Sequence, residues 1–403
     1  MGPLNIVLAA VNVLILYAWV LYPALLAWLA RTRPARSVQP SKTADLPPIS
    51  VILSAYNEEE HIGERIRNLR TMEYSSPWRA FIGIDGAKDA TAAVARAAAG
   101  DDSRITIFDF SENRGKVSVL KDLVSHARRQ AAADEILVFT DANTEFASDA
   151  LEHLCAPFAD ASVGGVCGRL RFVRPEGGTT EETAYWRVEN WLKAKESAVD
   201  SCLGANGAIY AIRPSLFWSA IPANTIIDDF VIGMKVREQN YRMIYEPDAV
   251  AEEEIPPAIH QEWERRVRIG AGNFQALRLC RASLSRSGGV FAWTFWSHKV
   301  LRWFAPHLLI AGVTLAFAAA GSPEPALGRI ALFCYLLFTA AALANRVQRI
   351  HPLGQIANGI YYFIVMQAAL FAGFLRFCRG NLDGRWKRTA RQLPAANAQV
   401  TEI

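Results

Sequence analysis

The chain has 403 residues with a formal net charge of +4, and 51% of its residues are hydrophobic while 20% are charged. This length allows one large soluble domain together with further segments, and so small a net charge argues against a nucleic-acid-binding protein. The six cysteines are scattered, with no close pair spaced for zinc and no dense disulfide framework, so we expect buried thiols in a reduced compartment.

The first 30 residues contain no charged side chain and are rich in Leu, Val and Ala. Their length suits a membrane span, and the lack of Lys or Arg before Arg31 argues against a cleaved signal peptide. Because Arg31, Arg33 and Arg36 follow at once, the positive-inside rule places the N-terminus outside and the next residues in the cytoplasm. We predict a transmembrane helix over 1–30 and a proline-rich linker over 31–48.

Between residues 49 and 140, short apolar runs alternate with helical patterns. Such alternation predicts right-handed crossovers and a mostly parallel sheet buried on both faces, and therefore a cytoplasmic α/β domain over 49–255. The predicted strands cover 49–55, 79–85, 104–109 and 135–140, and the predicted helices lie near 58–71, 90–99 and 117–133.

Polar residues follow each of the four predicted strands. They are "YNEEE" after the first, Asp85 after the second, "NRGK" with Lys116 after the third, and Asp141 with Asn143 after the fourth. Sheets of this kind bind ligands beyond the carboxyl ends of their strands. Each stretch alone has an ordinary explanation, because acidic residues favour helix N-termini and a loop lysine is commonly solvated. Their convergence favours a binding site.

These residues suit the transfer of a sugar from a nucleotide diphosphate donor. Tyr56 and Glu58 are candidates to flank a base and ribose, and Asp85 is a candidate to accept hydrogen bonds from the nucleoside. Lys116 follows a glycine that permits close backbone approach, and it begins a predicted helix whose N-terminus favours anions.

Asp141 and Asn143 are the candidate ligands of a divalent cation. Mg²⁺ or Mn²⁺ takes oxygen ligands, commonly one or two carboxylates together with the phosphates of a substrate. Asp141 supplies a carboxylate and Asn143 a neutral oxygen or a contact through water, so we expect weak metal binding until the nucleotide arrives. The alternative is a strand-end aspartate that caps the next helix.

The stretch "IIDDF" over 226–230 places two carboxylates before a helical pattern. We predict that Asp229 is the general base for an acceptor hydroxyl and that Asp228 orients it, although an N-cap pair is the plain alternative. In "GANGAIYAIR", Gly204, Asn206 and Gly207 are predicted to line the acceptor side, and a tight structural turn explains the glycines equally well.

Beyond residue 255 the sequence indicates a membrane-associated region. We predict interfacial amphipathic helices over 256–297, transmembrane helices over 298–376 and a basic cytoplasmic tail over 377–403. The apolar stretches lie at 300–320, 329–345 and 355–375. Four spans would place the tail outside, against the positive-inside rule. Either one C-terminal stretch is therefore re-entrant or interfacial, or a helix is split within 291–310.

The stretch "ERRVRIGAG" carries Arg265, Arg266 and Arg268 near the expected membrane surface. Arginines there commonly snorkel to lipid phosphates. The functional alternative is that one of them faces the departing pyrophosphate, and Arg268 is the candidate.

The ordered set "SAYNEE", Asp85, "NRGK", "TDAN", "IDDF", "RRVRI" and "RWKRT", flanked by apolar spans, resembles the membrane-bound family-2 glycosyltransferases. These are related to cellulose, hyaluronan, chitin and poly-N-acetylglucosamine synthases and to ceramide glucosyltransferase. The resemblance covers nearly the whole chain. It implies a cytoplasmic GT-A fold, a UDP-sugar donor, Mg²⁺ or Mn²⁺, inversion at the anomeric carbon and an acceptor site at a bacterial inner membrane.

The resemblance also implies roles for individual positions. It matches Asp85 to a uridine contact, Lys116 to the nucleotide pocket, Asp141 with Asn143 to the metal-binding D-x-D, Asp229 to the base, Arg268 to the arginine of Q-x-x-R-W and Trp386 to a tail tryptophan near the nucleotide.

Three positions depart from the family pattern. Asn143 replaces the second aspartate of D-x-D, and Asp228 stands where glutamate is usual. Arg265 and Ile269 replace the glutamine and tryptophan of Q-x-x-R-W. Because an aliphatic side chain offers no aromatic face to a sugar, Ile269 argues against processive polymerisation.

We therefore predict an enzyme that moves a sugar from a UDP-sugar to a lipid-linked or otherwise membrane-presented acceptor. Its partners would be the donor, that acceptor or a saccharide, and membrane lipids. Two alternatives stay open: a processive synthase that also translocates its polymer, and a non-catalytic nucleotide-binding membrane protein.

Overall fold

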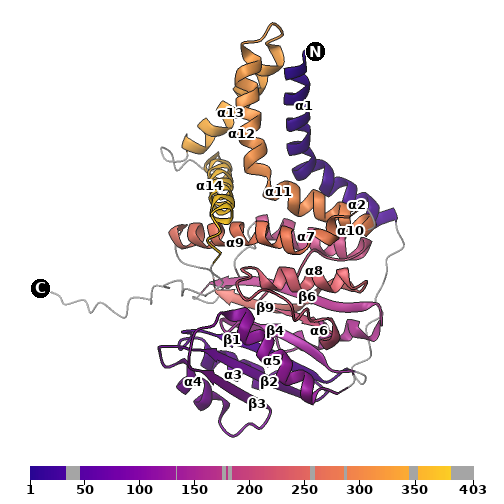
Figure 1. Ribbon diagram of the computed structural model, residues 1–403, viewed down its shortest axis with the longest axis vertical. Coiled ribbons are helices and arrows are strands. Elements are labelled where there is room, and N and C mark those ends of the chain that lie inside the picture. The colour runs from indigo at the N-terminus through magenta and orange to yellow at the C-terminus, as the bar shows by residue number, and fades with distance from the viewer. Residues whose placement is uncertain are drawn as a thin grey trace, which may run out of the picture.

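The computed structural model of the protein describes residues 1–32, 46–132, 134–174, 178–179, 184–254, 259–285, 288–344 and 353–382. A layered α/β domain lies at one end, and helices rise from it toward the N-terminus at the other end (Figure 1). Most of the predicted linker, and the basic tail with Trp386, lie outside the described residues.

One sheet forms the centre of the α/β domain, with the strand order β3-β2-β1-β4-β8-β6-β9-β5, and β7 pairs with β6. The first four strands are parallel, and they confirm the four predicted ones to within a residue at either end. Beyond β4 the sheet is mixed, because β8 runs antiparallel to β4 and β6 while β6 and β9 are parallel. The strands are β1 (Ile49–Ala55), β2 (Trp78–Asp85), β3 (Ile105–Phe110), β4 (Ile136–Thr140), β5 (Thr144–Phe146), β6 (Val163–Arg174), β7 (Gly178–Thr179), β8 (Tyr210–Ile212) and β9 (Arg242–Glu254).

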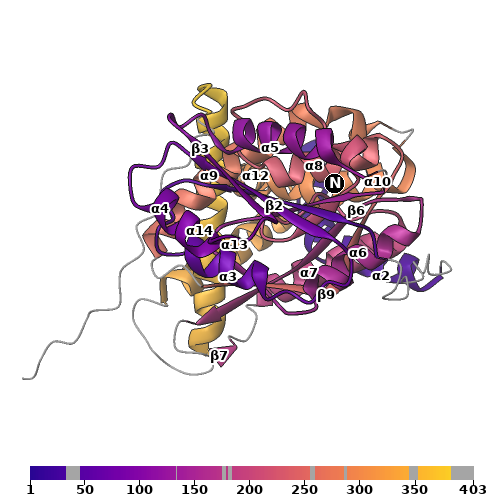
Figure 2. The ribbon, with the colours of Figure 1, turned by 90° about the horizontal axis from the view of Figure 1, so that it is seen from below.

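Helices cover both faces of the sheet (Figure 2). All seven residues of β1 are buried, as a strand covered on both sides requires. Val119 and Leu123 of one covering helix pack where Gly83 of β2 leaves room, since a Cβ at Gly83 would lie 2.3 Å from Val119 Cγ1. The covering helices are α3 (Ile62–Arg70), α4 (Thr91–Ala99), α5 (Lys116–Gln130), α6 (Ala150–Cys155), α7 (Ala184–Val199) and α8 (Asp228–Glu238).

The N-terminal apolar segment is helical from Pro3 to Thr32, with a π-helical turn over Tyr17–Leu21 between α1 (Pro3–Leu16) and α2 (Tyr22–Thr32). The turn precedes Pro23, which has no N–H to donate. A backbone carbonyl is therefore left over, and the oxygen of Ala18 accepts a hydrogen bond from Arg302 Nε at 3.3 Å. The predicted span is thus helical throughout, and a distant arginine satisfies its irregular turn.

The C-terminal region is also helical and contains one sharp bend. The segments Gly289–Trp303 and Ala305–Ala320 meet at 62°, inside the region where the sequence allowed a split, and Pro306 follows the break because its ring cannot fit the carbonyl four residues earlier. The helices are α9 (Ile259–Leu279), α10 (Gly289–Thr294), a π-helical turn (Phe295–Val300), α11 (Leu301–Trp303), α12 (Ala305–Ala320), α13 (Ala326–Ala344) and α14 (Leu353–Cys378).

Within the described residues, three helices are long and apolar enough to cross a membrane, at Pro3–Thr32, Ala326–Leu343 and Ala357–Cys378. The bent pair would make a fourth if it acted as a single span. Glu324, in the turn between α12 and α13, accepts a hydrogen bond from the backbone N–H of Gly2 at 3.0 Å. That turn and the N-terminus therefore lie on the same side of the molecule (Figure 1).

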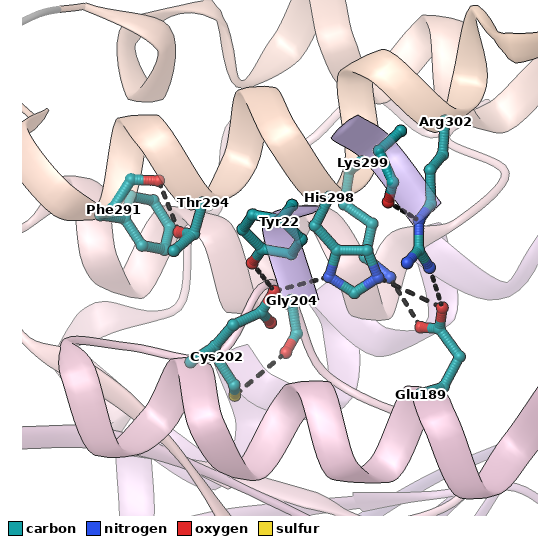
Figure 3. Close-up of polar contacts among 11 residues, drawn as sticks. Tyr22, Glu189, Cys202, Gly204, Phe291, Thr294, His298, Lys299 and Arg302 are labelled. Atoms are coloured by element: carbon teal, nitrogen blue, oxygen red, sulfur yellow. Dashed lines mark hydrogen bonds and ion pairs between the residues drawn. The ribbon is translucent and has the colours of Figure 1, made fainter. Parts of the chain in front are cut away.

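A buried polar cluster joins the α/β domain to the apolar helices (Figure 3). His298 is 1% exposed, and its Nδ1 and Nε2 lie 2.6 Å from Glu196 Oε1 and 3.2 Å from Glu189 Oε1 of α7. Tyr22 of α2 donates its hydroxyl to the same oxygen of Glu196 at 2.7 Å. Three segments far apart in the sequence thus share one set of hydrogen bonds.

Two cations complete this junction cluster. Lys299 Nζ lies 3.0 Å from Glu189 Oε2, and Arg302 Nη1 lies 3.2 Å from Glu189 Oε1. The guanidinium of Arg302 also lies over the ring of Trp19, at 4.5 Å from its centroid. Burial alone would raise the pKa of Glu189, but the attraction of Lys299 and His298 outweighs it and holds this pKa well below its usual value.

Candidate active site

The predicted metal ligand Asp141 and the predicted base Asp229 meet over Gly207, at the carboxyl end of the parallel strands. A Cβ placed on Gly207 would lie 3.2 Å from Asp141 Oδ2 and 3.3 Å from Asp229 Oδ2, and both distances are shorter than an ordinary van der Waals contact. The backbone N–H of Gly207 donates to Asp229 Oδ2 at 2.8 Å. The lack of a side chain at Gly207 therefore leaves room for the two carboxylates beside it.

Lys116 connects Asp141 to the acidic pair of α8. Its Nζ lies 2.7 Å from Asp141 Oδ1 and 3.9 Å from Asp228 Oδ2. Burial alone would lower the pKa of Lys116, but attraction to Asp141 and then to Asp228 raises it overall. Lys116 is therefore a firmly charged cation among three carboxylates.

The acidic pair at the start of α8 is held in a setting that favours proton uptake. Burial raises the pKa of Asp228 to about 6, against the lowering effect of Lys116. Burial likewise raises the pKa of Asp229, while Lys116 and the N–H groups of Phe230 and Gly207 oppose that rise. Carboxylates whose pKa values approach neutrality are suited to general base catalysis.

Asp85 holds the loop that delivers Lys116. Its side chain is 2% exposed, and its two oxygens accept hydrogen bonds from the backbone N–H groups of Arg114 and Gly115, each at 2.8 Å. Gly115 has a φ of 87°, which a residue with a Cβ rarely adopts. The structure thus gives Asp85 a positioning role, and its predicted contact with the nucleoside stays a prediction.

The turn with Tyr56 and Glu58 packs against the loop that follows β2. Asn57, which has a φ of 54°, accepts a hydrogen bond from the N–H of Lys88 at 2.8 Å through Oδ1. The N–H of Glu58 donates to Thr91 Oγ1 at 2.8 Å. The ends of β1 and β2 are therefore joined by hydrogen bonds, and the contacts of Tyr56 and Glu58 with a nucleoside stay a prediction.

The sequence analysis missed Arg65, which lies beneath the site. Its side chain is 1% exposed, its Nη2 donates to Thr140 Oγ1 at 3.0 Å, and Thr140 in turn donates to the carbonyl of Ala208 at 2.9 Å. Burial lowers the pKa of Arg65 to about 9, although Glu145 and Asp141 act in the opposite direction. This chain of hydrogen bonds fixes the strand end that carries Asp141 to the loop that carries Gly207.

The predicted acceptor residues of the 204–207 turn lie against α8. Gly204 has a φ of 75°, and a Cβ there would lie 2.4 Å from Phe230 Cδ2. Asn206 accepts a hydrogen bond from the N–H of Ile209 at 3.0 Å through its backbone oxygen. Gly204 therefore has a packing role, and its contact with an acceptor stays a prediction.

Helix α9, which carries Arg268 and Ile269, packs on the turn that leads into the acidic pair, since a Cβ on Gly272 would lie 3.1 Å from side-chain atoms of Ile226 and Ile227. Gln275 of α9 accepts from the N–H of Ile226 at 3.0 Å and donates to the carbonyl of Asn224 at 3.0 Å. The pKa of Arg268 is lowered by burial and by Arg265, while Asp228 acts in the opposite direction. Arg268 is therefore within electrostatic range of Asp228, and its contact with a departing pyrophosphate stays a prediction.

The donor set fits a divalent cation only together with a substrate. Among the described residues, no three acidic, histidine or cysteine side chains come together as a preformed metal site. Asp141 Oδ2, however, accepts no hydrogen bond within the described part of the chain, since Lys116 contacts Oδ1. One available carboxylate oxygen, the nearby Asn143 and two phosphates match the way Mg²⁺ is commonly bound.

Comparison with known proteins identifies the family. The chain matches the family model for glycosyl transferase family 2 over residues 50–210 and the one for glycosyl transferase family group 2 over residues 136–374. It is 25% identical over 241 residues to the poly-beta-1,6-N-acetyl-D-glucosamine synthase of Staphylococcus aureus (strain COL), which covers 58% of this chain and 56% of that protein. The Staphylococcus epidermidis synthase is 24% identical over 249 residues, or 57% and 55% of the two chains. The chain thus spans about half the length of the curated relatives it matches.

A solved structure extends the likeness over almost the whole chain. It is the mannosyltransferase PcManGT from Pyrobaculum calidifontis in complex with GDP-Man and Mn²⁺, with a TM-score of 0.69 and 23% identity, over 93% of this chain and 99% of that one. At this identity the likeness shows the fold, which is GT-A as the sequence predicted. Since one family model covers more than half of the residues, the chain belongs to the family-2 glycosyltransferases.

Proposed function

We propose that this glycosyltransferase moves a sugar from a UDP-sugar to a lipid-linked acceptor at the cytoplasmic face of a bacterial inner membrane. The observation that carries the proposal is the meeting of Asp141 and Asp229 over Gly207 beside Lys116, directly under α9 and the apolar helices. A catalytic centre at that place is accessible to an acceptor presented by a membrane.

In the proposed reaction, Asp229 takes the proton of the acceptor hydroxyl. The acceptor oxygen then forms a bond to the anomeric carbon, the bond from that carbon to the diphosphate oxygen breaks, and the sugar inverts. The N–H groups of Gly207 and Phe230 each donate a hydrogen bond of 2.8 Å to an oxygen of Asp229, and these two bonds fix the orientation of the carboxylate. Asp228, buried and beside Lys116, sets the charge around the base.

The negative charge of the leaving diphosphate is assigned to two groups. The Lys116 ammonium would pair with the diphosphate, because it is the cation that lies beside Asp141 and Asp228 at the end of the sheet. Mg²⁺ or Mn²⁺ held by Asp141 and Asn143 would neutralise the phosphates when bound. Tyr56, Glu58 and Asp85 are the proposed nucleoside side of the pocket.

A screen of donors tests the proposal. Purified protein in detergent, supplied with bacterial lipid extract, Mn²⁺ or Mg²⁺ and a panel of UDP- and GDP-sugars, is expected to release one nucleoside diphosphate, and a chelator is expected to stop the release. GDP-sugars belong in the panel because the similar mannosyltransferase binds GDP-Man. Release from a GDP-sugar alone would replace the proposed donor, and no release from any donor would favour a nucleotide-binding protein without activity.

The names of the sequence relatives favour a second candidate, a polysaccharide synthase. Product length separates the two. One added sugar per lipid acceptor supports the proposed transfer, whereas long chains on a size-exclusion column support the synthase. Ile269, with no aromatic face for an acceptor sugar, favours the single addition.

The acidic pair makes the reaction dependent on pH. Because the base Asp229 must be ionised and burial raises its pKa above the usual value of an aspartate, kcat is expected to rise about tenfold per pH unit while Asp229 is mostly protonated and to level off once it is ionised. Lys116 lowers the pKa of both aspartates, so Lys116→Gln should move this limb to higher pH. Measurement of kcat from pH 5 to 8 on the wild type and on Lys116→Gln checks both expectations. If kcat rose over the same pH range in the two proteins, Lys116 would not influence the pKa of the acidic pair.

A further inference from the structure

Helix α14 runs in a different direction from the other long apolar helices. In Figure 1, α1 and α12 stand upright while α14 is strongly foreshortened, and in Figure 2 α14 is seen along its length. Its axis therefore runs largely across theirs. By length and composition alone α14 is able to cross a membrane. If α1 and α12 cross the membrane, however, the direction of α14 is that of a helix lying along the membrane surface.

The distribution of charge agrees with this orientation. The sequence has no charged residue from Leu353 to Leu375, and Arg376 and Arg379 then end the helix. With α1, α12 and α13 as the crossing helices, α14 on the surface keeps these arginines on the same side as Arg31, in accord with the positive-inside rule. A crossing α14 would place them on the other side, away from the α/β domain.

Helix α14 is pressed closely onto α9. A Cβ on Gly373 would lie 2.7 Å from Gly270 Cα and 2.7 Å from the carbonyl oxygen of Val267. The rings of Phe274 and Phe374 lie beside this contact, with centroids 4.9 Å apart in an edge-to-face arrangement. The two glycines therefore allow the backbones of α9 and α14 to cross in close contact. Each helix carries an arginine within one turn of its glycine.

Those arginines are Arg268 on α9 and Arg376 on α14. Arg376 donates its Nε to the carbonyl oxygen of Asn381 at 3.0 Å, which leaves its two terminal nitrogens for another partner. Within the described residues, neither Arg268 nor Arg376 forms an ion pair with a carboxylate. Arg376, like Arg265, is close enough to Arg268 to lower its pKa further. Arg268 and Arg376 thus lie on the facing turns of α9 and α14 next to the contact of Gly270 with Gly373, where a bound anion would offset their repulsion.

We propose that Arg376, brought to the catalytic centre by a helix that lies along the membrane surface, binds a phosphate oxyanion of the substrate together with Arg265 and Arg268. The inference rests on the proposed function and extends it. The phosphate belongs either to the leaving diphosphate of the donor or to the headgroup of a lipid acceptor. Both present the same charge to the arginines.

Arg376→Gln tests the proposal against the matched control Arg379→Gln, which removes an exposed arginine one turn further along. Loss of a charge-assisted hydrogen bond should lower kcat/KM by about 10- to 100-fold in Arg376→Gln, with little change in Arg379→Gln. Titration with UDP assigns the phosphate. Weaker UDP binding in Arg376→Gln means the donor diphosphate, whereas a raised KM for the lipid acceptor with unchanged UDP binding means the acceptor headgroup.

The proposal is overturned if Arg376→Gln equals Arg379→Gln in both kcat/KM and UDP affinity while both proteins unfold at the temperature of the wild type. A wild type without any nucleotide release would defeat the proposed function instead, and the UDP titration alone would then decide the role of Arg376.

The exposed Cys378 tests the orientation of α14 independently. In a Cys334→Ser background, a membrane-impermeant maleimide should label Cys378 from the same side of sealed vesicles as a cysteine introduced at Asp101 of the α/β domain. It should not label Cys378 from the side of a cysteine introduced at Ser322, in the turn after α12. Labelling from the side of position 322 would show that α14 crosses the membrane, and the proposal would fail.

Discussion

Asp229→Asn is expected to lower kcat by about 10²- to 10⁴-fold, the range that a general base commonly contributes. The substitution keeps the shape of the side chain, although its single oxygen can accept from only one of the N–H groups of Gly207 and Phe230, which now donate to Oδ2 and Oδ1, each at 2.8 Å. An amide cannot take the proton of the acceptor hydroxyl. Nucleotide binding should therefore change by only a few-fold, because the loss lies in the chemical step.

Steady-state nucleotide release and a UDP titration on the same preparation measure the two quantities. Asp101→Asn is the matched control, since Asp101 is exposed in a turn far along the chain from the acidic pair. If Asp229→Asn kept a third or more of the wild-type kcat, Asp229 would not be the base. The same assay on Asp228→Asn would then show whether its neighbour takes that role.

Glu189→Ala is expected to destabilise the folded protein by about 3–5 kcal/mol, the cost of removing one partner from a buried ion pair. Lys299 and Arg302 would lose their shared carboxylate while staying largely buried, and His298 would lose one of its two contacts. Thermal or denaturant unfolding in one detergent measures the change. Because the cluster joins α7 to the segment before α12, catalytic activity should fall at temperatures where the wild type is still stable.

Glu64→Ala is the control, because Glu64 forms an exposed pair with Arg67 within one helix turn, and such pairs contribute little. The sign with pH follows from the lowered pKa of Glu189. Its contribution is present above the pKa of an unfolded glutamate, about 4.3, and is lost as the pH falls through the folded value. Equal stability of Glu189→Ala and Glu64→Ala would mean that the junction cluster adds nothing to the fold.

The parallel half of the sheet was predictable from the sequence because its strands are short apolar runs separated by helical patterns. Since parallel strands end on one edge, the meeting of Asp141 with Lys116 followed from the order of the motifs. The mixed half was not predictable in the same way. Strand β8 has only three residues, Tyr210–Ile212, and its antiparallel pairing with β4 depends on contacts that no local pattern records.

Other features were missed for a related reason. Arg65 lies in a helix rich in charged residues and resembles a solvated side chain, yet it is 1% exposed because Thr140 and Phe146 enclose it. His298 and Glu196 are 102 residues apart, so only the fold brings them together. The span count stayed open because composition gives the length of an apolar helix and not its direction in the fold.

The pairing of Lys116 with Asp141 has a consequence for turnover. The Lys116 ammonium lies 2.7 Å from Asp141 Oδ1 and 3.9 Å from Asp228 Oδ2, so it offsets part of the mutual repulsion of the three aspartates. In the proposed reaction the diphosphate would pair with Lys116 in competition with Asp141, which would regain the lysine as the product leaves. Asp141 would thus limit how long the product diphosphate stays bound.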